Sequence, residues 1–512
     1  MNRVLPPPTQ RGASSAPADA FERTRLENAH PGDWRNPKPA DRYHLLVIGA
    51  GTAGLVAAHG AAMLGARVAL IERNLLGGDC LNVGCVPSKA LIRTSRLYAD
   101  IRNAAHFGAT APAQVEVDFA AVMARMRGIR ARISRADSVQ RLVAAGIDVF
   151  FGQARFTERN TVTVDGKRLR FRKALIATGA RPELPVIQGL AEAGFLTNES
   201  LFDLTALPQR LLVIGGGPLG CEMAQAFRRF GAHTIIAQDK PMFLPGEERD
   251  AAQLLSDAFA REGIEVRLNS HAVAVRADGE RKQVDLVSDG HTTTVEVDAI
   301  LAGVGRVPNV EDLDLAKAGI ECDRERGVHV NDFLQTHNRH VYAAGDVCLE
   351  HKFTHTADAS ARIVVRNALF PGRQRLSALT IPWCTYTDPA IAHVGLYVRQ
   401  ANERDIPVKT FTIPMHDVDR AVTDSEETGF VKIHVRERSD HILGATVVAR
   451  HAGEMINEIT LAMVAGIGLG TLAHVIHAYP TQAEAIRKAA DAYQRTRLTP
   501  IVQSLLRRWL RR

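Results

Sequence analysis

The chain has 512 residues, of which 46% are hydrophobic and 23% are charged, values typical of a folded protein with large cores. They exclude wholesale disorder and collagen-like repeats, and six cysteines are too few for a disulfide scaffold of this length. The net charge of +7 is scattered along the chain and only 5% of the residues are aromatic, so we expect no nucleic-acid partner. At about 150 residues per domain, the length predicts roughly three domains.

The two ends of the chain differ from the rest. The leader, residues 1–42, is rich in proline, alanine and charge and lacks apolar periodicity, so we predict that it is disordered. It holds no apolar secretory signal, and no segment offers the ~18 apolar residues of a membrane span, so we expect a cytoplasmic protein. The C-terminal LLRRWLRR is interpreted as a solvated helix end in preference to a basic amphipathic helix at an anionic surface.

Two segments share one pattern, in which an apolar strand leads through a glycine turn into a helix and then into a second strand. The first is YHLLVIGAGTAGLVAAHGAAMLGARVALIER (43–73), and the second is RLLVIGGGPLGCEMAQAFRRFGAHTIIAQDK (210–240). The pattern is typical of a nucleotide-binding unit. Its repetition predicts two such units in one chain.

The periodicity changes between and after these units. It predicts a helix within 118–150, short strands over 150–182, hairpin strands over 255–300 and a buried strand at 340–347. From about residue 378, strands are followed by helices at 452–466, 468–475 and 481–494. The fold class we predict is α/β, with two Rossmann-like dinucleotide-binding domains and an α+β C-terminal domain.

The first glycine turn is Gly49-x-Gly51-x-x-Gly54, and Glu72 ends the strand that follows. Glycines let the backbone approach a pyrophosphate at a helix N-terminus, and an acid about twenty residues further on can bind a ribose hydroxyl. Between a predicted strand and a predicted helix, this pattern favours a bound dinucleotide over a tight turn without a ligand.

The second glycine turn contains Gly215, Gly217 and Gly220 in the same context. The strand-end position that would hold an acid is occupied by Gln238, and Lys240 follows two residues later. An acid at this position favours the free 2′-hydroxyl of NADH, whereas basic residues favour the 2′-phosphate of NADPH. The choice stays open, with a slight preference for NADPH because the acid is missing.

A pair of cysteines, Cys80 and Cys85, lies in GGDCLNVGCVPSKALIR (77–93), directly behind the first nucleotide-binding unit. The two are within reach of one another for a disulfide, and a helix N-terminus with Lys89 nearby would lower a thiol pKa. Redox chemistry is therefore favoured over a reduced pair that only packs in a helix. The spacing, without a partner pair, argues against zinc, and we assign no metal ligands.

This cysteine motif resembles the signature of the flavoprotein disulfide reductases, which include dihydrolipoamide dehydrogenase, glutathione reductase and mercuric reductase. Further matches are ATGARP (177–182), GVGRVPN (303–309), AAGDV (343–347), YTDPAIAHVG (386–395) and YPTQAEA (479–485). The resemblance covers residues 43 to about 495. It implies an FAD-binding domain over 43–195 and 321–377, an NAD(P)H-binding domain over 196–320 and a dimerisation domain over 378–512.

The resemblance also implies a role for each motif residue. Cys85 would be the thiol nearest the flavin, and Cys80 the interchange thiol that attacks the substrate. Lys89 would pair with Glu222 beside the flavin, where hydride arrives from the nicotinamide. The implied cofactor-binding residues are Gly49, Gly51, Gly54, Glu72, Lys89, Ala154, Thr178, Gly179, Asp346, Gly215, Gly217, Gly220, Gln238, Lys240 and Gly305.

The C-terminal motif departs from that of the lipoamide and glutathione enzymes, in which His-Pro-Thr-x-x-Glu supplies an acid–base histidine across the dimer. Here Tyr479 replaces the histidine, Glu484 keeps the place of the glutamate, and His477 lies two residues earlier, where an extended segment could point it the same way. Tyrosine titrates near 10 and is a poor base at neutral pH. Mercuric reductase resembles this chain in the tyrosine, but the vicinal cysteine pair near its C-terminus has no counterpart after Cys384.

The sequence therefore predicts a homodimeric, FAD- and NAD(P)H-dependent oxidoreductase of mercuric-reductase-like type. Its electron acceptor would be a small molecule, a disulfide or a metal ion. Dihydrolipoamide dehydrogenase is the alternative enzyme, and a flavin-bound redox sensor is the non-enzymatic alternative.

Overall fold

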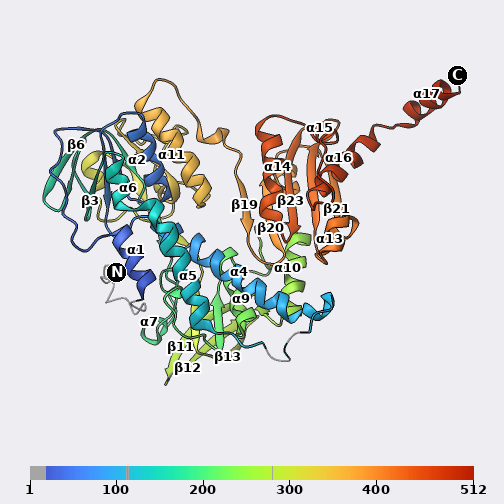
Figure 1. Cartoon of the computed structure of the whole chain (residues 1–512), viewed down its shortest axis with the longest axis horizontal. Coiled ribbons are helices and arrows are strands. Elements are labelled where there is room, and N and C mark those ends of the chain that lie inside the picture. Colours follow the sequence, from blue (N-terminus) through green and yellow to red (C-terminus); the bar gives the residue numbers. More distant parts are fainter. Residues whose placement is uncertain (1–18, 111, 113–114, 280, 512) are drawn as a thin grey trace.

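The computed structural model describes residues 19–110, 112, 115–279 and 281–511. It forms three units, with the first nucleotide-binding unit at the left of Figure 1, the C-terminal unit at the right and the second nucleotide-binding unit below and between them. The α/β fold class is as predicted. Among the described residues, no helix is long and apolar enough to cross a membrane.

The first unit is built on a sheet whose central strand, β1 (Tyr43–Ile48), lies parallel to β2 (Val68–Glu72) and β6 (Lys167–Ile176). Beyond these lie β3 (Ile147–Phe151), β18 (Val341–Ala343) and the antiparallel strands β5 (Thr161–Val164) and β4 (Arg155–Glu158). Leu45 packs among the residues of α2 (Thr52–Met63) and α11 (Thr354–Leu369), while Leu46 packs on the opposite face. Burial on both faces explains why residues 45–48 of this strand are all apolar.

The second unit repeats this plan with a parallel sheet in the order β10–β9–β8–β14. Its strands are β8 (Arg210–Ile214), β9 (His233–Ala237), β10 (Glu265–Arg267) and β14 (Ala299–Ala302). An antiparallel sheet of β11 (Ser270–Asp278), β12 (Arg281–Ser288) and β13 (His291–Val297) follows. The predicted hairpins are thereby confirmed from residue 270 on, whereas residues 255–262 complete helix α10 (Arg249–Glu262).

The boundary at residue 320 that the sequence analysis placed between the second unit and the rest of the first is too late. Strand β15 (Arg306–Pro308) pairs with β7 (Ala180–Pro182), which leads out of the first unit. Leu313 and Ile320 are buried in the core of the first unit. The chain therefore returns to the first unit soon after β14, because these apolar side chains belong to that core.

The C-terminal unit is an antiparallel sheet in the order β19–β20–β23–β22–β21. Its strands are β19 (Pro382–Thr385), β20 (Ala390–Gly395), β21 (Val408–Pro414), β22 (Phe430–Arg436) and β23 (Ile442–Ala449). The three predicted helices are present as α14 (Ala452–Val464), α15 (Leu469–Leu472) and α16 (Glu484–Thr496). The α+β character predicted for this part of the chain is confirmed.

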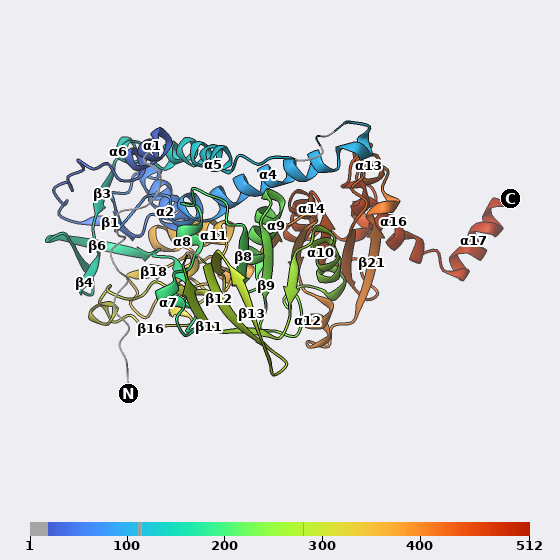
Figure 2. The same cartoon turned by 90° about the horizontal axis from the view of Figure 1, so that it is seen from below.

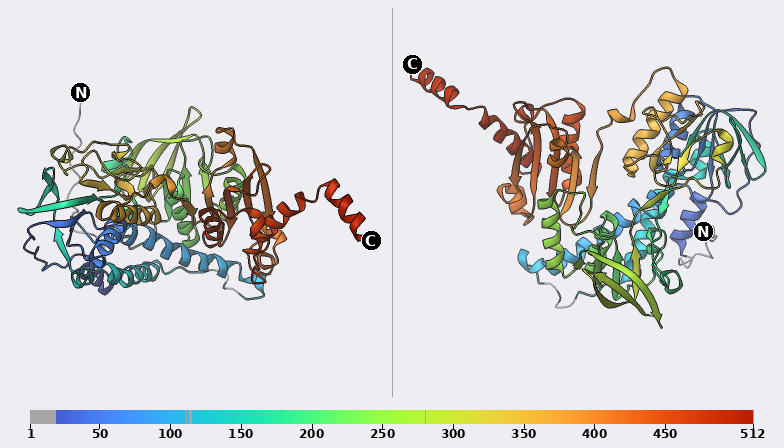
Figure 3. Two further views of the ribbon diagram at one scale, coloured as in Figure 1. Left: turned by 90° about the horizontal axis from the view of Figure 1, so that it is seen from above. Right: turned by 180° about the vertical axis from the view of Figure 1, so that it is seen from behind.

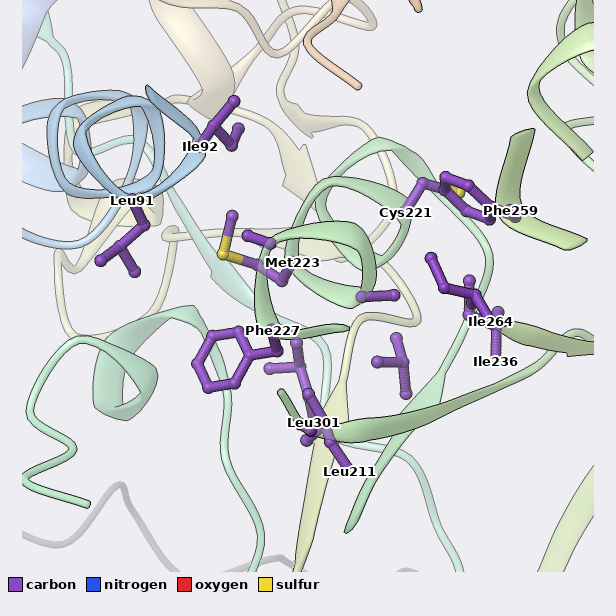
Figure 4. Packing of buried hydrophobic residues seen from close by; sticks show 14 of the residues in the cluster. Leu91, Ile92, Leu211, Cys221, Met223, Phe227, Ile236, Phe259, Ile264 and Leu301 are labelled. Atoms are coloured by element: carbon purple, nitrogen blue, oxygen red, sulfur yellow. The ribbon is translucent and has the colours of Figure 1, made fainter. Parts of the chain in front are cut away.

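One hydrophobic cluster fixes the first unit to the second. Leu91 and Ile92 of α4 (Cys85–Arg102) face Met223 and Phe227 of α9 (Pro218–Phe230) across this cluster, as Figure 4 shows. All four side chains are buried. Because α4 begins at the second cysteine of the motif and α9 begins at the second glycine turn, this packing sets the geometry between the two motifs.

The leader was expected to be disordered, and this is wrong for residues 19–42; residues 1–18 lie outside the described part of the chain. Helix α1 (Ala20–Ala29) packs against α5 (Phe119–Ser134), as seen at the top of Figure 2. Its buried face is ionic: Glu22 contacts Arg25 and lies 2.9 Å from the Arg130 guanidinium. The helix was missed because its contact face carries charge in place of apolar periodicity.

The single helix expected within 118–150 is two helices followed by β3. Helix α5 ends at Ser134, and α6 (Val139–Ala144) starts anew. The Ser138 hydroxyl caps α6 by accepting a hydrogen bond from the backbone of Arg141 at 3.4 Å. A serine with this capping role marks a helix start, which the apolar spacing alone did not reveal.

Replacing Glu22 by alanine should destabilise the protein, because it leaves the buried guanidinium groups of Arg25 and Arg130 without their carboxylate. Breaking one side of a buried ion pair costs about 3–5 kcal/mol. The free energy of unfolding in urea measures the loss. Glu27→Ala, an exposed position on the same helix, is the matched control. Equal unfolding midpoints for the two variants would contradict the ionic packing of α1.

Candidate functional site

The first glycine turn brings the backbone of α2 unusually close to β1. A Cβ atom on Gly54 would lie 1.8 Å from the carbonyl oxygen of Gly49, so only glycine permits this approach. Gly51 is the N-cap residue of α2 and has no side chain to cover the free N–H groups of the first turn. The turn therefore offers bare backbone donors at a helix N-terminus, which is the arrangement that binds a pyrophosphate.

Glu72 closes this turn from the neighbouring strand. Its carboxylate is buried and accepts hydrogen bonds from the backbone N–H groups of Ala50 and Asn74, both at 2.7 Å. Burial raises the pKa of Glu72. A pocket next to it is lined by Gly49, Glu72, Ala154 and Thr178 among others. The structure thus gathers four of the expected FAD-binding residues around one pocket, and the donor set fits an adenosine diphosphate moiety.

The second glycine turn matches the first closely. A Cβ atom on Gly220 would lie 2.2 Å from the carbonyl oxygen of Gly215. The Gln238 side chain is buried, and its Oε1 accepts a hydrogen bond from the N–H of Gly216 at 2.7 Å, as Glu72 does in the first turn. Lys240 lies exposed just beyond, with its Nζ 3.2 Å from Asp239 Oδ2. Gln238 therefore keeps the structural role of the acid and removes its charge.

The two motif cysteines lie on consecutive helices, Cys80 within α3 (Gly78–Asn82) and Cys85 at the first position of α4. Both are free thiols in this structure. The hydrogen bond from Cys80, assisted by the hydrogen bond to Thr354 and the positive charge of Lys89, lowers the pKa of Cys85 to about 6. The same contact, together with burial, raises the pKa of Cys80. The pair therefore holds one proton on Cys80 and a thiolate on Cys85.

Thr354 is a member of the site that the sequence did not reveal. It is the first residue of α11, and its Oγ1 lies 3.3 Å from the sulfur of Cys85. A hydroxyl at this distance from a sulfur atom is placed to stabilise a thiolate. Its position, seven residues after the end of the AAGDV motif, carries no signal of its own in the sequence.

Lys89 and Glu222 lie together as the resemblance implies. The Lys89 Nζ is 2.8 Å from Glu222 Oε2, and Glu222 is buried. The third member of this cluster is Tyr386, whose backbone N–H donates to Glu222 Oε1 at 2.9 Å and whose ring centroid lies 4.5 Å from Lys89 Nζ. Tyr386 comes from the C-terminal unit, so the ammonium group is held by all three units of the chain.

A second ionic link ties the cysteine loop to Arg306, in the segment that returns to the first unit after β14. Arg306 forms an ion pair with Asp79, next to Cys80, and donates to the carbonyl of Ala180 at 2.8 Å. Its Nε lies 3.7 Å from Asp346 Oδ2, and burial raises the pKa of that acid. Asp346 is therefore at the site, but it faces an arginine that the sequence analysis did not single out although it lies in GVGRVPN.

Three further expected cofactor residues, Thr178, Gly179 and Gly305, lie in the loops beside the strands around this arginine. Thr178 Oγ1 donates to the carbonyl of Asn309 at 2.7 Å, and the Asn309 N–H donates to the carbonyl of Gly179 at 2.9 Å. Gly305 has a φ of +146°, a backbone angle that residues with a side chain rarely adopt. These contacts hold the segment 305–309 against the end of β6.

The C-terminal motif separates His477 from Tyr479. His477 Nε2 lies 3.0 Å from Glu458 Oε1 on α14, whereas the Tyr479 hydroxyl donates to Asp419 Oδ2 at 2.9 Å. The expectation that both could point the same way is wrong, because each has its own carboxylate partner. Tyr479 is 72% exposed, and Asp419 raises its pKa. Glu484 is buried and bound to Arg487.

Two family models match nearly the whole described chain. The pyridine nucleotide-disulphide oxidoreductase model matches residues 43–361, and the dimerisation-domain model of the same group matches residues 381–490. The match begins after α1 and ends before the last helix.

Curated relatives and solved structures agree with these models. A mercuric reductase from Lysinibacillus sphaericus is 33% identical over 89% of this chain and 83% of its own length. A dihydrolipoyl dehydrogenase from Thermus scotoductus is 34% identical over 88% of this chain and 97% of its own. The HOCl-induced flavoprotein disulfide reductase RclA from Escherichia coli superposes with a TM-score of 0.79 at 28% identity, covering 88% of this chain and 99% of its own.

Replacing Lys89 by methionine should raise the pKa of Cys85 from about 6 to about 7 or above, because a positive charge that stabilises the thiolate is lost and the negative Glu222 is left unpaired. The measurement is the pH dependence of thiolate absorbance in the reduced protein. Arg93→Met, one turn further along α4 and exposed, controls for the loss of a distant positive charge. An unchanged titration in Lys89→Met would remove Lys89 from the electrostatics of the pair.

Proposed function

The chain belongs to the pyridine nucleotide-disulphide oxidoreductase family, which uses FAD and NAD(P)H, and on this premise we propose that it passes electrons from NAD(P)H through FAD and the Cys80–Cys85 pair to a thiophilic metal ion. The proposal makes it a mercuric-reductase-like enzyme. Electron transfer through the cysteine pair is supported by one observation, the cluster of Cys80, Cys85, Thr354 and Lys89.

The cofactor and the residues around the cysteine pair have separate roles in the proposed electron transfer. FAD, when bound, accepts a hydride from NAD(P)H and supplies the electron pair that opens the disulfide. Reduction of the disulfide by two electrons and one proton leaves a thiolate on Cys85 and a thiol on Cys80. Lys89 and Thr354 stabilise the thiolate, and Cys80 is the sulfur left to attack an acceptor.

The C-terminal motif favours a metal ion over a disulfide as the acceptor. When a thiolate attacks a disulfide, the departing thiolate is helped by a proton donor, and an imidazole supplies this at neutral pH. Tyr479 replaces that imidazole, and the carboxylate of Asp419 raises its pKa further above the neutral range. A metal ion bound by the two sulfurs leaves no departing thiolate to protonate, and its binding releases the Cys80 proton; a mercuric reductase is among the relatives.

Dihydrolipoyl dehydrogenase remains the second candidate because of one contact. The imidazole of His477 is hydrogen-bonded to the Glu458 carboxylate at 3.0 Å, which is the pairing that orients a histidine base. A dihydrolipoyl dehydrogenase is 34% identical to this chain. If His477 reaches the thiol pair of a second copy, the protein would exchange disulfides.

We propose a homodimer with the active site shared across the interface. The dimerisation-domain match covers a group of exposed apolar side chains on the C-terminal unit, a pattern that marks an interaction surface. They are Leu461, Val464, Ile467, Val475 and Ile476. We also propose the cytoplasm as the location, because the four cysteines outside the redox pair are free, which fits a reducing compartment.

Replacing Cys85 by serine should separate cofactor binding from electron transfer. Wild-type protein, yellow with FAD, should develop a long-wavelength absorption band on two-electron reduction, from the contact between the Cys85 thiolate and the flavin. Cys85→Ser should keep the flavin and lose the band. Cys384→Ser, a cysteine outside the motif, should keep both. A band that survives in Cys85→Ser would show that another thiol meets the flavin.

Lys240→Ala tests the choice of nucleotide. If Lys240 meets the 2′-phosphate, its loss should weaken NADPH binding about ten- to hundredfold, which corresponds to ~1.5–3 kcal/mol, and leave NADH almost unaffected. Titration of the oxidised protein with each nucleotide gives the two dissociation constants. Equal losses for NADPH and NADH would place Lys240 outside the phosphate site.

Tyr479→His tests whether the residue at this position decides between a disulfide and a metal ion as the electron acceptor. If tyrosine limits disulfide exchange, the variant should reduce lipoamide or glutathione disulfide faster by some part of the 10²–10⁴-fold that acid–base help provides, while nucleotide-to-flavin transfer stays unchanged. His477→Ala is the companion variant. Efficient lipoamide turnover by the wild type that collapses in His477→Ala would instead support the second candidate.

A further inference from the structure

The last helix of the chain stands apart from the rest of the molecule. Helix α17 (Pro500–Leu510) projects from the C-terminal unit in every view (Figures 1–3). Its N-terminus is capped: the Thr499 hydroxyl accepts a hydrogen bond from the Val502 N–H at 3.3 Å, and a proline occupies the first turn. Every described residue from Arg495 to Arg511 is exposed.

The exposed side chains of α17 separate into two faces. The apolar residues recur at the spacing i, i+1, i+4, i+5, i+8 and i+9, which places them on one side of a helix. They are Ile501, Val502, Leu505, Leu506, Trp509 and Leu510. Ile501, Trp509 and Leu510 are 74%, 69% and 74% exposed. This continuous apolar face argues against the interpretation of the C-terminus as an ordinary solvated helix end.

The polar face of α17 and the segment that leads into the helix carry only basic or neutral side chains. Gln503, Ser504, Arg507 and Arg508 fill the polar side of the helix. After Asp491 the sequence holds six arginines and no acidic residue; the last of these, at position 512, lies outside the described residues. A partner for this helix must therefore present an apolar layer beside negative charge.

We propose that α17 is an interfacial anchor that lays its apolar face into the surface of an anionic lipid bilayer. A bilayer of acidic lipids offers both features at once, with acyl chains next to charged headgroups. A second copy of α17 fits less well, because two such helices would bring their arginines together. The helix lies beyond the 381–490 match, so the anchor would be an addition to the catalytic body and independent of its acceptor.

Vesicle co-sedimentation of the full-length flavoprotein tests the anchor. Vesicles of phosphatidylcholine with phosphatidylglycerol should bind the protein, and vesicles of phosphatidylcholine alone should bind it at least tenfold more weakly. Leu505→Glu/Trp509→Glu and Arg507→Glu/Arg508→Glu should each lower binding about tenfold or more. Raising the salt concentration should weaken it too.

The matched control is Arg324→Glu/Arg326→Glu, which makes the same change of net charge at two exposed positions on the body. It should bind vesicles as the wild type does, and all variants should oxidise NAD(P)H at the wild-type rate. The proposal is overturned if anionic vesicles bind no protein, if uncharged vesicles bind equally well, or if the control loses binding as strongly as the α17 variants. Loss of the dimer in Leu505→Glu/Trp509→Glu without any vesicle binding would assign the face to a second copy.

Discussion

The packing of α4 on α9 is the contact on which the candidate site depends. Leu91 and Ile92 are fixed against Met223 and Phe227, and this brings Lys89 to 2.8 Å from Glu222. The ammonium group then stands close enough to Cys85 to favour its thiolate. A hydrophobic contact between two units thus sets the electrostatics of a sulfur atom, and a shift of either helix would be felt as a change of thiol pKa.

The two nucleotide-binding units show how one backbone plan is adjusted by a single side chain. Glu72 and Gln238 occupy the same place and accept the same kind of backbone hydrogen bond at 2.7 Å. The first turn has a buried acid at this place, and the amide leaves the second turn neutral. A neutral residue does not repel a 2′-phosphate, which is why the nucleotide preference depends on what lies beyond the strand, at Lys240.

Much of the fold and part of the site were predictable because the relevant signals are local. The glycine turns, the cysteine motif and the apolar strands each fall within a short stretch of sequence. Thr354, Tyr386 and Arg306 were missed because their roles arise only where distant segments meet. Helix α1 was missed for another reason: its buried face is made of Glu22 and Arg25, and a search for apolar periodicity passes over ionic packing.

The central claim is that Cys80 and Cys85 form a redox pair in electronic contact with FAD. An anaerobic titration with dithionite, followed until the flavin absorbance is fully bleached, counts the electrons that each protein stores. The account predicts that the wild type consumes twice as much reductant per FAD as Cys80→Ser, because the disulfide holds one electron pair and the flavin the other. Equal consumption by the two proteins would contradict it.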